Sequence, residues 1–589
     1  MALTVHLLGR PRVEGSGTVY QVRSRKSWAL LACLLLDDRP RTRARLAGLL
    51  YPEAQDPLRA LRWGLTEIRR CLGVPVDGDP VALRLPEDAV VDVHVLRHGS
   101  WASAIRLPGL DAELLDGVGV RGSPVFESWL LSERARVAAA AEAILHEAAL
   151  GKLAEGDLNT ARDLALRAAA MNPLDENHQA LVIRLYRLAG DDAAARRQFT
   201  AVTALFREEL GVAPGVAIEQ AMQETRVSRA RAEQEPADQV SVESIDAIVE
   251  SGAAAVAAGA VEAGIRSLRA SVGLADRSGS ARLRLSSRLR LAEALIHSLR
   301  GMDEEGLATL HEADRLALTD HDRAASAQAR AEMGYVDFLR ARYDRAEHWL
   351  SGALTAAAGS PAITARITTY LGAVHSDRAD YAQARDLLER AVSLARSADD
   401  PRTEAYALSM LGRVHLLLHD LRPAAAYLEE SARTAQSDHW LAFLPWPQAL
   451  RGEVHLAAGD VEAAAGVLRQ AFARACQLGD PCWEGIAARS LALVAEARGA
   501  TEQAFALLSD ARTRSNRLAD PYVWLDAHIL DAQCGLGVRH GHRDTPAWID
   551  ALRRLAARSG MQEMRVRAIR HGAALGNPAD RAAAALLAG

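Results

Sequence analysis

The chain has 589 residues, of which 49% are hydrophobic and 25% charged, and its formal net charge at pH 7 is −5. This length is too great for one hydrophobic core, so we expect several domains. Aromatic residues make up only 5%, whereas alanine, leucine and arginine dominate, which favours helices that pack through small side chains. Composition therefore predicts a soluble, globular and mainly α protein.

The net charge is unevenly distributed along the chain. Residues 1–100 contain 15 Lys and Arg against 11 Asp and Glu, and within residues 23–70 the count is 11 against 5. The N-terminal balance of +4 leaves −9 for the remainder. A positive region on an otherwise acidic chain is the electrostatic pattern of a nucleic-acid-binding module.

The cysteines indicate a reducing compartment. Cys33, Cys71, Cys476, Cys482 and Cys534 are odd in number and contain no CxxC pair, so we interpret them as reduced core thiols of a cytoplasmic protein. The N-terminus lacks the layout of a signal peptide, and no run reaches about 18 apolar residues. These features argue against secretion and against a membrane-spanning segment.

The first 50 residues predict a small sheet and two helices. Residues 3–8 and 18–22 alternate loosely between apolar and polar side chains, as short strands do. Residues 27–36, SWALLACLLL, predict a buried helix, and residues 42–50 predict a shorter one.

The most informative segment is residues 56–73, DPLRALRWGLTEIRRCLG. Asp56 can cap a helix that has Pro57 in its first turn. Apolar residues at helical spacing then predict a buried stripe: Leu58, Leu61, Leu65, Ile68 and Leu72. At about 100° per residue, the opposite side carries Arg59, Trp63, Thr66 and Arg70, flanked by Arg62 and Arg69.

An arginine-rich face on an anchored helix suits a DNA major groove, because guanidinium pairs bidentately with guanine edges or with phosphate. We predict groove contacts for the four central residues and phosphate contacts for Arg62 and Arg69. For this helix alone, a solvated face is the alternative. Further candidates for phosphate contacts are the preceding basic residues Arg23, Arg25, Lys26, Arg41, Arg43 and Arg45.

The next residues predict a closing hairpin. Strands around residues 74–76 and 81–85 are joined by Asp77-Gly78-Asp79, a strong turn signal. Strands, three helices and a hairpin predict a winged helix-turn-helix whose third helix reads DNA. Because the two aspartates would repel phosphate, Arg84 on the following strand is the predicted wing-side contact.

At this point the residues carry a family resemblance. Residues 3–97 resemble the DNA-binding domain of the Streptomyces antibiotic regulatory protein (SARP) family, through ALLACLLL, RARLAGLLYPE and LRWGLTEIRRCLG. Residues 111–117, 126–137, 161–191 and 205–215 look like the bacterial transcriptional activator domain (BTAD) that follows in that family. The resemblance implies a bacterial activator that binds double-stranded DNA as a dimer on direct repeats and recruits RNA polymerase through this domain.

Further along, the chain repeats itself. Gly334, Gly372, Gly412, Gly452 and Ala492 recur at intervals of 38 to 40, and each is followed 12 positions later by an alanine. Two small residues at this offset mark the close approach of the paired helices of a tetratricopeptide repeat (TPR). Weaker copies are Gly252/Gly264 and Ala294/Gly306, and Ala149/Ala161 and Ile183/Ala195 lie 34 apart in the activator region.

Helix starts keep the same interval. Asp400-Pro401, Asp480-Pro481 and Asp520-Pro521 each offer an Asp cap with proline in the first turn. The intervening unit instead has His439, Trp440 and then Pro445-Trp446-Pro447, which predicts a shortened first helix and a candidate contact site. The alternative there is a tolerated irregularity.

These patterns predict four segments. They are a winged helix-turn-helix at 1–97, a helical, TPR-like activator domain at 98–226, a polar linker at 227–243 and a TPR solenoid at 244–580. We expect the solenoid to leave its concave side chains free for a protein or small-molecule ligand.

Motifs for catalysis are missing from the sequence. Gly151-Lys152 is the only GK pair and lacks the glycine and Ser/Thr of a phosphate loop, and there is no GxSxG, HExxH or zinc spacing. We interpret His540, His542 and His571 as residues of an exposed loop and its neighbouring helix rather than metal ligands. The sequence therefore predicts no catalytic residue, cofactor or metal.

Three functions from different classes remain open. The first is a sequence-specific DNA-binding activator with a regulatory TPR array. The second is a TPR interaction scaffold whose N-terminal domain no longer binds DNA, for which the acidic wing turn is the best support. The third is a hydrolase or nucleotide-driven switch, against which the missing motifs count.

Overall fold

The computed structural model describes residues 3–15, 18–20, 22–37, 40–120, 123–223, 242–257, 261–298, 303–357, 359–517 and 520–588. Two compact units are formed, one by Met1–Ala148, Arg553–Gly560 and Arg565–Gly589 and the other by Ala149–Leu552 and Met561–Met564. The predicted linker at 227–243 lies outside the described residues except for its last two, which begin a helix. Among the described helices, none has both the length and the apolar character needed to span a bilayer.

The first unit begins with a small sheet. Strands β1 (Thr4–His6), β2 (Arg12–Gly15), β3 (Thr18–Tyr20) and β6 (Val90–Val91) pair in the order β3-β2-β1-β6, with β6 parallel to β1. The buried carboxylate of Asp92, at the start of α4 (Asp92–His98), accepts hydrogen bonds from the backbone N–H groups of Leu7 and Leu8 at 2.9–3.0 Å. This contact fixes α4 to the strand that the sequence predicted first, whereas β2 and β6 were not predicted.

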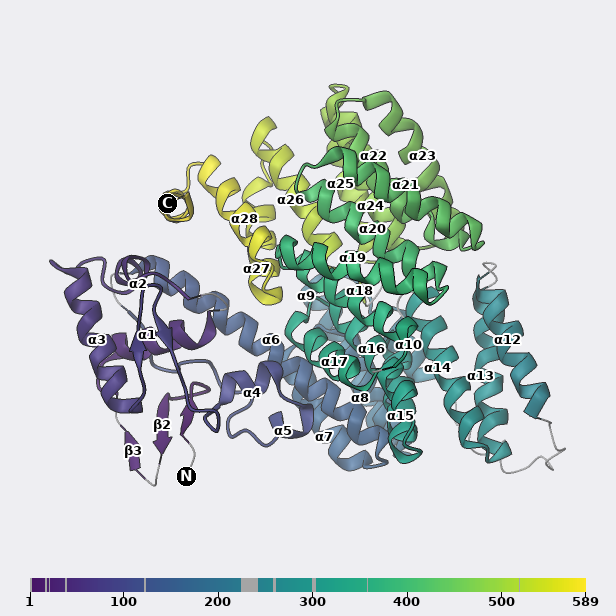
Figure 1. Ribbon diagram of the computed structural model, residues 1–589, viewed down its shortest axis with the longest axis horizontal. Helices are drawn as coiled ribbons and strands as arrows, with labels where there is room; N and C mark the ends of the chain where they lie inside the picture. The colour runs from purple at the N-terminus through teal and green to yellow at the C-terminus, as the bar shows by residue number, and fades with distance from the viewer. Residues whose placement is uncertain are drawn as a thin grey trace. The chain divides into compact units, whose positions relative to one another are not determined.

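Three helices and a hairpin complete the winged helix-turn-helix that the sequence predicted. The helices are α1 (Arg25–Leu36), α2 (Arg43–Leu50) and α3 (Pro57–Leu72), and the wing is β4 (Val76–Asp77) paired antiparallel with β5 (Ala82–Leu83). Their shared core includes Leu30, Leu31, Leu46 and Leu50, all fully or almost fully buried. The chain continues into α5 (Trp101–Ala104) and the long α6 (Pro124–Ala154), which Figure 1 shows and which passes from the first unit into the second after Ala148.

The second unit is built from helices. They are α7 (Leu158–Met171), α8 (Glu176–Leu188), α9 (Asp192–Leu210), α10 (Val216–Gln223), α12 (Val242–Ala257), α13 (Val261–Ser278), α14 (Ala281–Ser298), α15 (Asp303–Thr319), α16 (Arg323–Leu339), α17 (Tyr343–Ala356), α18 (Pro361–Asp377), α19 (Tyr381–Ser397), α20 (Pro401–Leu417), α21 (Leu421–Ser437), α22 (Pro445–Ala457), α23 (Val461–Leu478), α24 (Pro481–Ala497), α25 (Thr501–Ser515) and α26 (Val523–His540). The chain ends with α27 (Thr545–Ser559), α28 (Gln562–Ala574) and α29 (Pro578–Ala588). Consecutive helices from α12 to α25 pack in pairs, which is the arrangement of a TPR solenoid.

The small residues lie where the paired helices come closest. A Cβ atom on Gly412 of α20 would stand 2.6 Å from Leu428 Cγ and 3.3 Å from the Ala424 carbonyl oxygen of α21. Gly372 of α18 meets Leu388 and Ala384 in the same way, at 2.6 and 3.4 Å. The spacing of 12 in the sequence therefore identified real helix contacts.

The predicted helix starts were right at two places and wrong at one. Asp400 and Asp480 cap α20 and α24, each with proline in the first turn. Asp520 does not cap α26, which begins at Val523 with Tyr522 as its N-cap. The reason is that the Asp520 carboxylate is buried and accepts hydrogen bonds from Arg340 and Asn177.

The proline-rich unit has the shortened first helix that the sequence predicted. Helix α22 has 13 residues, against 17 in α20 and α24, and is preceded by a short 3₁₀ turn at Leu441–Phe443. Trp446 is 2% exposed, and Ser409 Oγ accepts a hydrogen bond from its indole N–H at 3.1 Å. Trp446 is thus a core residue, whereas His439 is exposed, and the contact site stays a prediction.

A glycine-to-alanine pair tests this packing. Gly412→Ala should lower the free energy of unfolding by about 1–3 kcal/mol, because the added methyl group meets Leu428. Gly466→Ala is the matched control, since a Cβ there meets nothing within 4 Å in the middle of α23, and it should stabilise by about 0.5–1 kcal/mol. Urea or thermal unfolding checks both, and equal effects of the two changes would contradict the packing argument.

Candidate nucleic-acid interface

Helix α3 is fixed at both ends. The Asp56 side chain caps it by accepting the Arg59 backbone N–H at 2.9 Å, Pro57 lies in the first turn, and Gly73 ends it with φ of 67°. These are the capping features that the sequence predicted. A helix with defined ends presents its side chains at fixed angles.

The body of α3 is held against α1 and α2. Leu61, Leu65, Ile68 and Leu72 are buried, as predicted. A Cβ on Gly64 would stand 2.7 Å from Tyr51 Oη and 3.0 Å from Leu30, so the absence of a side chain permits this close contact.

Hydrogen bonds to Glu67 connect α3 to the start of α1. Its carboxylate accepts hydrogen bonds from the Arg23 backbone N–H at 2.8 Å and from Ser27 Oγ at 2.5 Å. Burial raises the pKa of the nearby Tyr51 hydroxyl to about 12, and the Glu67 charge adds to the rise. Tyr51 is therefore neutral at pH 7, and α3 is anchored by both apolar and polar contacts.

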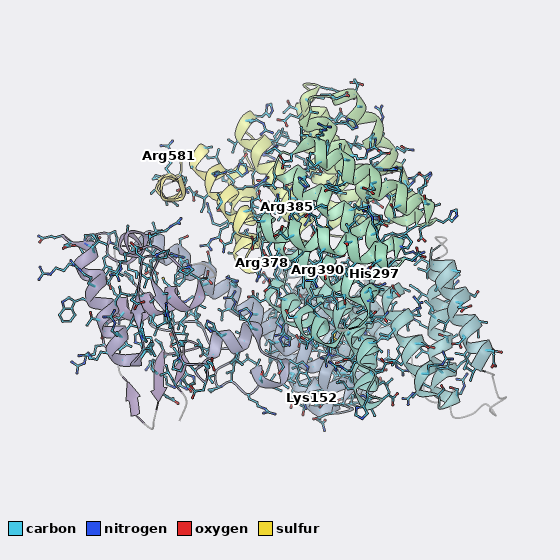
Figure 2. The ribbon with its side chains drawn as sticks, in the orientation of Figure 1. Lys152, His297, Arg378, Arg385, Arg390 and Arg581 are labelled. Atoms are coloured by element: carbon cyan, nitrogen blue, oxygen red, sulfur yellow. The ribbon has the colours of Figure 1, made fainter. Side chains whose placement is uncertain are left out.

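The face opposite the core is exposed. The six predicted contact residues of α3, Arg59, Arg62, Trp63, Thr66, Arg69 and Arg70, all have exposed side chains. Trp63 is 76% exposed, an unusual state for the largest apolar side chain. Side chains of α3 stand out from the ribbon at the left edge of Figure 2.

The predicted apolar stripe was wrong at its first residue. Leu58 is 48% exposed. At 100° per residue it lies about 50° from the centre of the buried stripe, in the first turn of the helix. This angular offset can be calculated from the sequence, so the exposure of Leu58 could have been predicted.

Two residues that were predicted to contact phosphate, Arg43 and Arg69, form hydrogen bonds with the wing. Arg69 Nη2 donates to the Val76 carbonyl at 2.5 Å, and Arg43 Nε donates to the Gly78 carbonyl at 2.9 Å. The Asp79 carboxylate accepts the Arg43 backbone N–H at 2.8 Å. These bonds join α2 and α3 to the hairpin, a role that residue spacing alone does not reveal.

The remaining candidates differ in their surroundings. Lys26 Nζ lies 5.2 Å from the centre of the Tyr51 ring, within cation–π range, whereas Arg45 and Arg84 are exposed. Arg41 is bound by Asp37, with Nη2 2.6 Å from Oδ1, and its guanidinium lies over Trp129. Burial raises the pKa of Asp37 to about 6, although Arg41 opposes the rise.

The side chains considered as alternative sites have structural partners. Lys152, labelled in Figure 2, pairs with Glu155 at 2.7 Å. His540 Nε2 lies 3.3 Å from Glu496, and the His542 ring stacks on Trp548 at 4.7 Å between centroids. The described structure has four buried free cysteines, whereas Cys476 is exposed, so its prediction as a core thiol was wrong.

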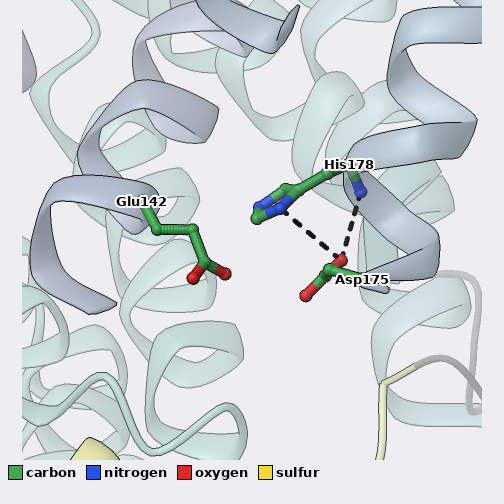
Figure 3. A group of neighbouring side chains, drawn as sticks. All are labelled: Glu142, Asp175 and His178. Carbon is green, nitrogen blue, oxygen red and sulfur yellow. Dashed lines mark hydrogen bonds and ion pairs between the residues drawn. The ribbon is translucent and has the colours of Figure 1, made fainter. Parts of the chain in front are cut away.

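Figure 3 shows Glu142, Asp175 and His178, of which Asp175 is the N-cap residue of α8. Asp175 caps this helix by accepting the backbone N–H groups of Asn177 and His178 at 3.0 and 3.1 Å. Glu142 belongs to the first compact unit, where Arg558 Nη2 donates to its carboxylate at 2.8 and 2.9 Å. Helix capping and an ion pair account for these carboxylates.

Two charged side chains of the repeats have partners within the array. His297, labelled in Figure 2, bonds through Nε2 to Glu332 at 2.7 Å, and its ring stacks on Tyr335. Arg413 is 1% exposed and donates to Asp377 at 2.5 Å. The expected binding of a ligand to the concave face stays a prediction.

Two segments match known families. Residues 91–226 match the bacterial transcriptional activator domain, and residues 363–437, which span α18 to α21, match the tetratricopeptide repeat. Both descriptions name modules that are generally not catalytic. No curated protein matches the chain.

Solved structures give broader similarities. Mycobacterium tuberculosis EmbR, in complex with a low-affinity phosphopeptide, aligns at 20% identity and a TM-score of 0.30, over 40% of this chain and 66% of that one, just under two thirds. A Rap protein complexed with Competence and Sporulation Factor aligns at 12% identity and 0.42, over 58% and 96%. Aspartyl phosphate phosphatase F from Bacillus subtilis aligns at 12% identity and 0.33, over 69% and 94%.

The two family matches carry the assignment, and they agree with the order of segments along the chain. The chain therefore contains a bacterial transcriptional activator domain, followed by tetratricopeptide repeats.

Proposed function

We propose that this regulator binds DNA through α3, recruits RNA polymerase through its activator domain and carries no catalytic site. The observation that supports DNA reading is the exposed Arg–Trp face on a helix capped at both ends and anchored by buried side chains. Arginine can pair with guanine edges in the major groove, and the Trp63 ring can contact a thymine methyl group. The proposed boundaries remain 1–97, 98–226 and 244–580.

The wing turn bears on the scaffold alternative, whose best support is repulsion of phosphate by Asp77 and Asp79. The Asp79 carboxylate accepts the Arg43 backbone N–H at 2.8 Å, which orients it toward α2 while it keeps its negative charge. Exposed Arg84 follows β5 and remains the proposed wing-side contact.

The first test concerns base reading by α3. Arg59→Ala or Arg70→Ala should weaken specific binding by about 1–3 kcal/mol and relax sequence preference, because a base-edge contact is lost. Trp63→Ala should act similarly if its ring meets a base. Binding titrations on operator and scrambled DNA measure both quantities. Arg10→Ala is the control, since Arg10 is exposed in the turn between β1 and β2; unchanged preference in all three α3 variants would contradict the proposal.

A second test separates phosphate contact from wing support. Arg62→Ala should reduce the slope of log affinity against log salt by about one, because one phosphate contact is lost. Arg69→Ala should leave that slope nearly unchanged and weaken binding through the displaced wing, since its guanidinium bonds to Val76. Binding isotherms at four salt concentrations distinguish the two. A slope reduced equally by both changes would show that Arg69 holds phosphate.

A third test concerns stoichiometry. One winged domain reads a short site, so useful specificity calls for two copies. We expect two protomers on each direct-repeat operator, measured by the mass of the complex. One protomer on an operator that supports full activation would contradict this part of the proposal.

A further inference from the structure

The last helices of the chain belong to the same compact unit as the winged domain. Arg553–Gly560 and Arg565–Gly589, here called the C-terminal segment, are grouped with Met1–Ala148, whereas Ala149–Leu552 form the second unit. Helix α27 therefore starts in the second unit and ends in the first. A segment so distant in the sequence needs specific contacts to be held in the first unit.

The firmest of these contacts joins α27 to α6. Arg558 Nη2 donates to both carboxylate oxygens of Glu142, at 2.8 and 2.9 Å, although the two residues are 416 positions apart. The Glu142 side chain is 6% exposed and that of Arg558 46%. A buried carboxylate with a bonded cation costs much more to disrupt than an exposed ion pair. The attachment of α27 to α6 therefore depends on Arg558.

A second contact lies around the turn between α27 and α28. Gly560 ends α27 with φ of 75°, and a Cβ atom there would stand 3.3 Å from Arg136 Nε of α6. Arg565 Nη1 of α28 lies 4.0 Å from Glu133 Oε1, and Arg136 Nη1 lies 3.9 Å from Glu133 Oε2. Glu133 is 4% exposed. Arginines from α6 and from α28 thus share one buried carboxylate.

This group of charges extends to the residues before α2. Burial lowers the pKa of Arg565, Glu133 opposes the change, the charges of Arg41 and Arg136 add to it, and Asp37 opposes it. The guanidinium nevertheless stays charged at pH 7. Arg41 is itself bound by Asp37, with Nη2 2.6 Å from Oδ1. The C-terminal segment therefore interacts electrostatically with the connection between α1 and α2.

Arg41 connects this region to the wing. Its guanidinium lies 5.7 Å from the centre of the Trp129 ring of α6, and its carbonyl oxygen accepts the Val81 backbone N–H at 2.9 Å. Val81 directly precedes β5, and exposed Arg84 follows that strand. A cavity of about 130 Å³, lined in part by Arg41, Val81 and Leu83, lies beside this contact. Because apolar packing is incomplete here, the position of β5 depends more strongly on polar contacts such as that of Arg41.

We propose that Arg558 and Arg565 are positioning residues for the wing. They hold α6 in place, so that Trp129 supports Arg41 and the Arg41 carbonyl holds the start of β5. The C-terminal segment, which α27 connects to the repeat array, is then a working part of the winged domain. The effect on DNA affinity rests on the proposed function, whereas the effect on the wing does not.

The test compares Arg558→Gln and Arg565→Gln in the full-length chain. Both side chains are partly exposed, at 46% and 23%, so each site can accommodate an uncharged glutamine. In either variant the Val81 amide should exchange its hydrogen about fivefold faster, because its acceptor is less firmly held. Hydrogen exchange measured on peptides that cover residues 80–84 reports this change without any DNA.

DNA titrations give the second measurement. Affinity for the operator should fall by about three- to tenfold in both glutamine variants, whereas sequence preference should not change, because no base contact is lost. If the unchanged protein did not bind DNA, the proposed function would fail, and the exchange at Val81 would still decide whether the segment holds the wing. Faster exchange with unchanged affinity in a protein that binds its operator would overturn the role in DNA binding.

Two further variants separate positioning from general damage. Arg565→Lys keeps the charge beside Glu133 and should retain the exchange rate and the affinity of the unchanged protein. Arg554→Gln is the matched control, since it changes an exposed arginine one turn before Arg558 in α27, and it should alter neither quantity. Failure of Arg565→Lys to retain both, or an equal effect of Arg554→Gln, would contradict the proposal.

Folding of each variant is checked by circular dichroism and by the unfolding midpoint. Faster exchange at residues 553–560 with no change at Val81, in folded Arg558→Gln and Arg565→Gln proteins, would overturn the proposal, because the segment would then be attached without acting on the wing. If neither variant folds, Glu142→Gln, which keeps the shape of the side chain and removes its charge, decides by the same measurement.

Discussion

Close approach of paired helices at small residues is the constraint on which the repeat array depends. A Cβ atom at Gly334, Gly372 or Gly412 would stand 2.6–2.7 Å from a leucine of the partner helix. Backbones this close bring the next turns of both helices into contact, so that Leu350, Leu388 and Leu428 are fully buried. Each pair then presents a similar surface to its neighbour, and the stacking can repeat.

The winged helix-turn-helix domain is held together differently. Helix α3 has no repeat partner, and its position comes from a capped start, a glycine end and the Glu67 contacts to the chain before α1. Arg43 and Arg69 then attach the hairpin to α2 and α3 through backbone carbonyls. Helix α3 and the wing are thereby fixed relative to each other within the domain, and in the proposed DNA complex this would reduce the ordering cost of binding.

Local and periodic features could be predicted from the sequence. The cap at Asp56, the glycine end at Gly73, the helices of the winged domain and the small-residue pairs depend on neighbours a few residues away. Asp520 could not be predicted in the same way. Its dipeptide is identical to those at Asp400 and Asp480, and only Arg340 and Asn177, which are 180 and 343 residues away, make it different.

The candidate interface shows the same division. The angular position of Trp63 sufficed to predict its exposure, because a helix face follows from spacing. The roles of Arg43 and Arg69 could not be predicted from spacing. An arginine looks the same in a sequence whether its guanidinium bonds to water, to phosphate or to a carbonyl of the wing. Composition and spacing thus locate the exposed face of α3, and only the three-dimensional structure distinguishes the roles of the residues on it.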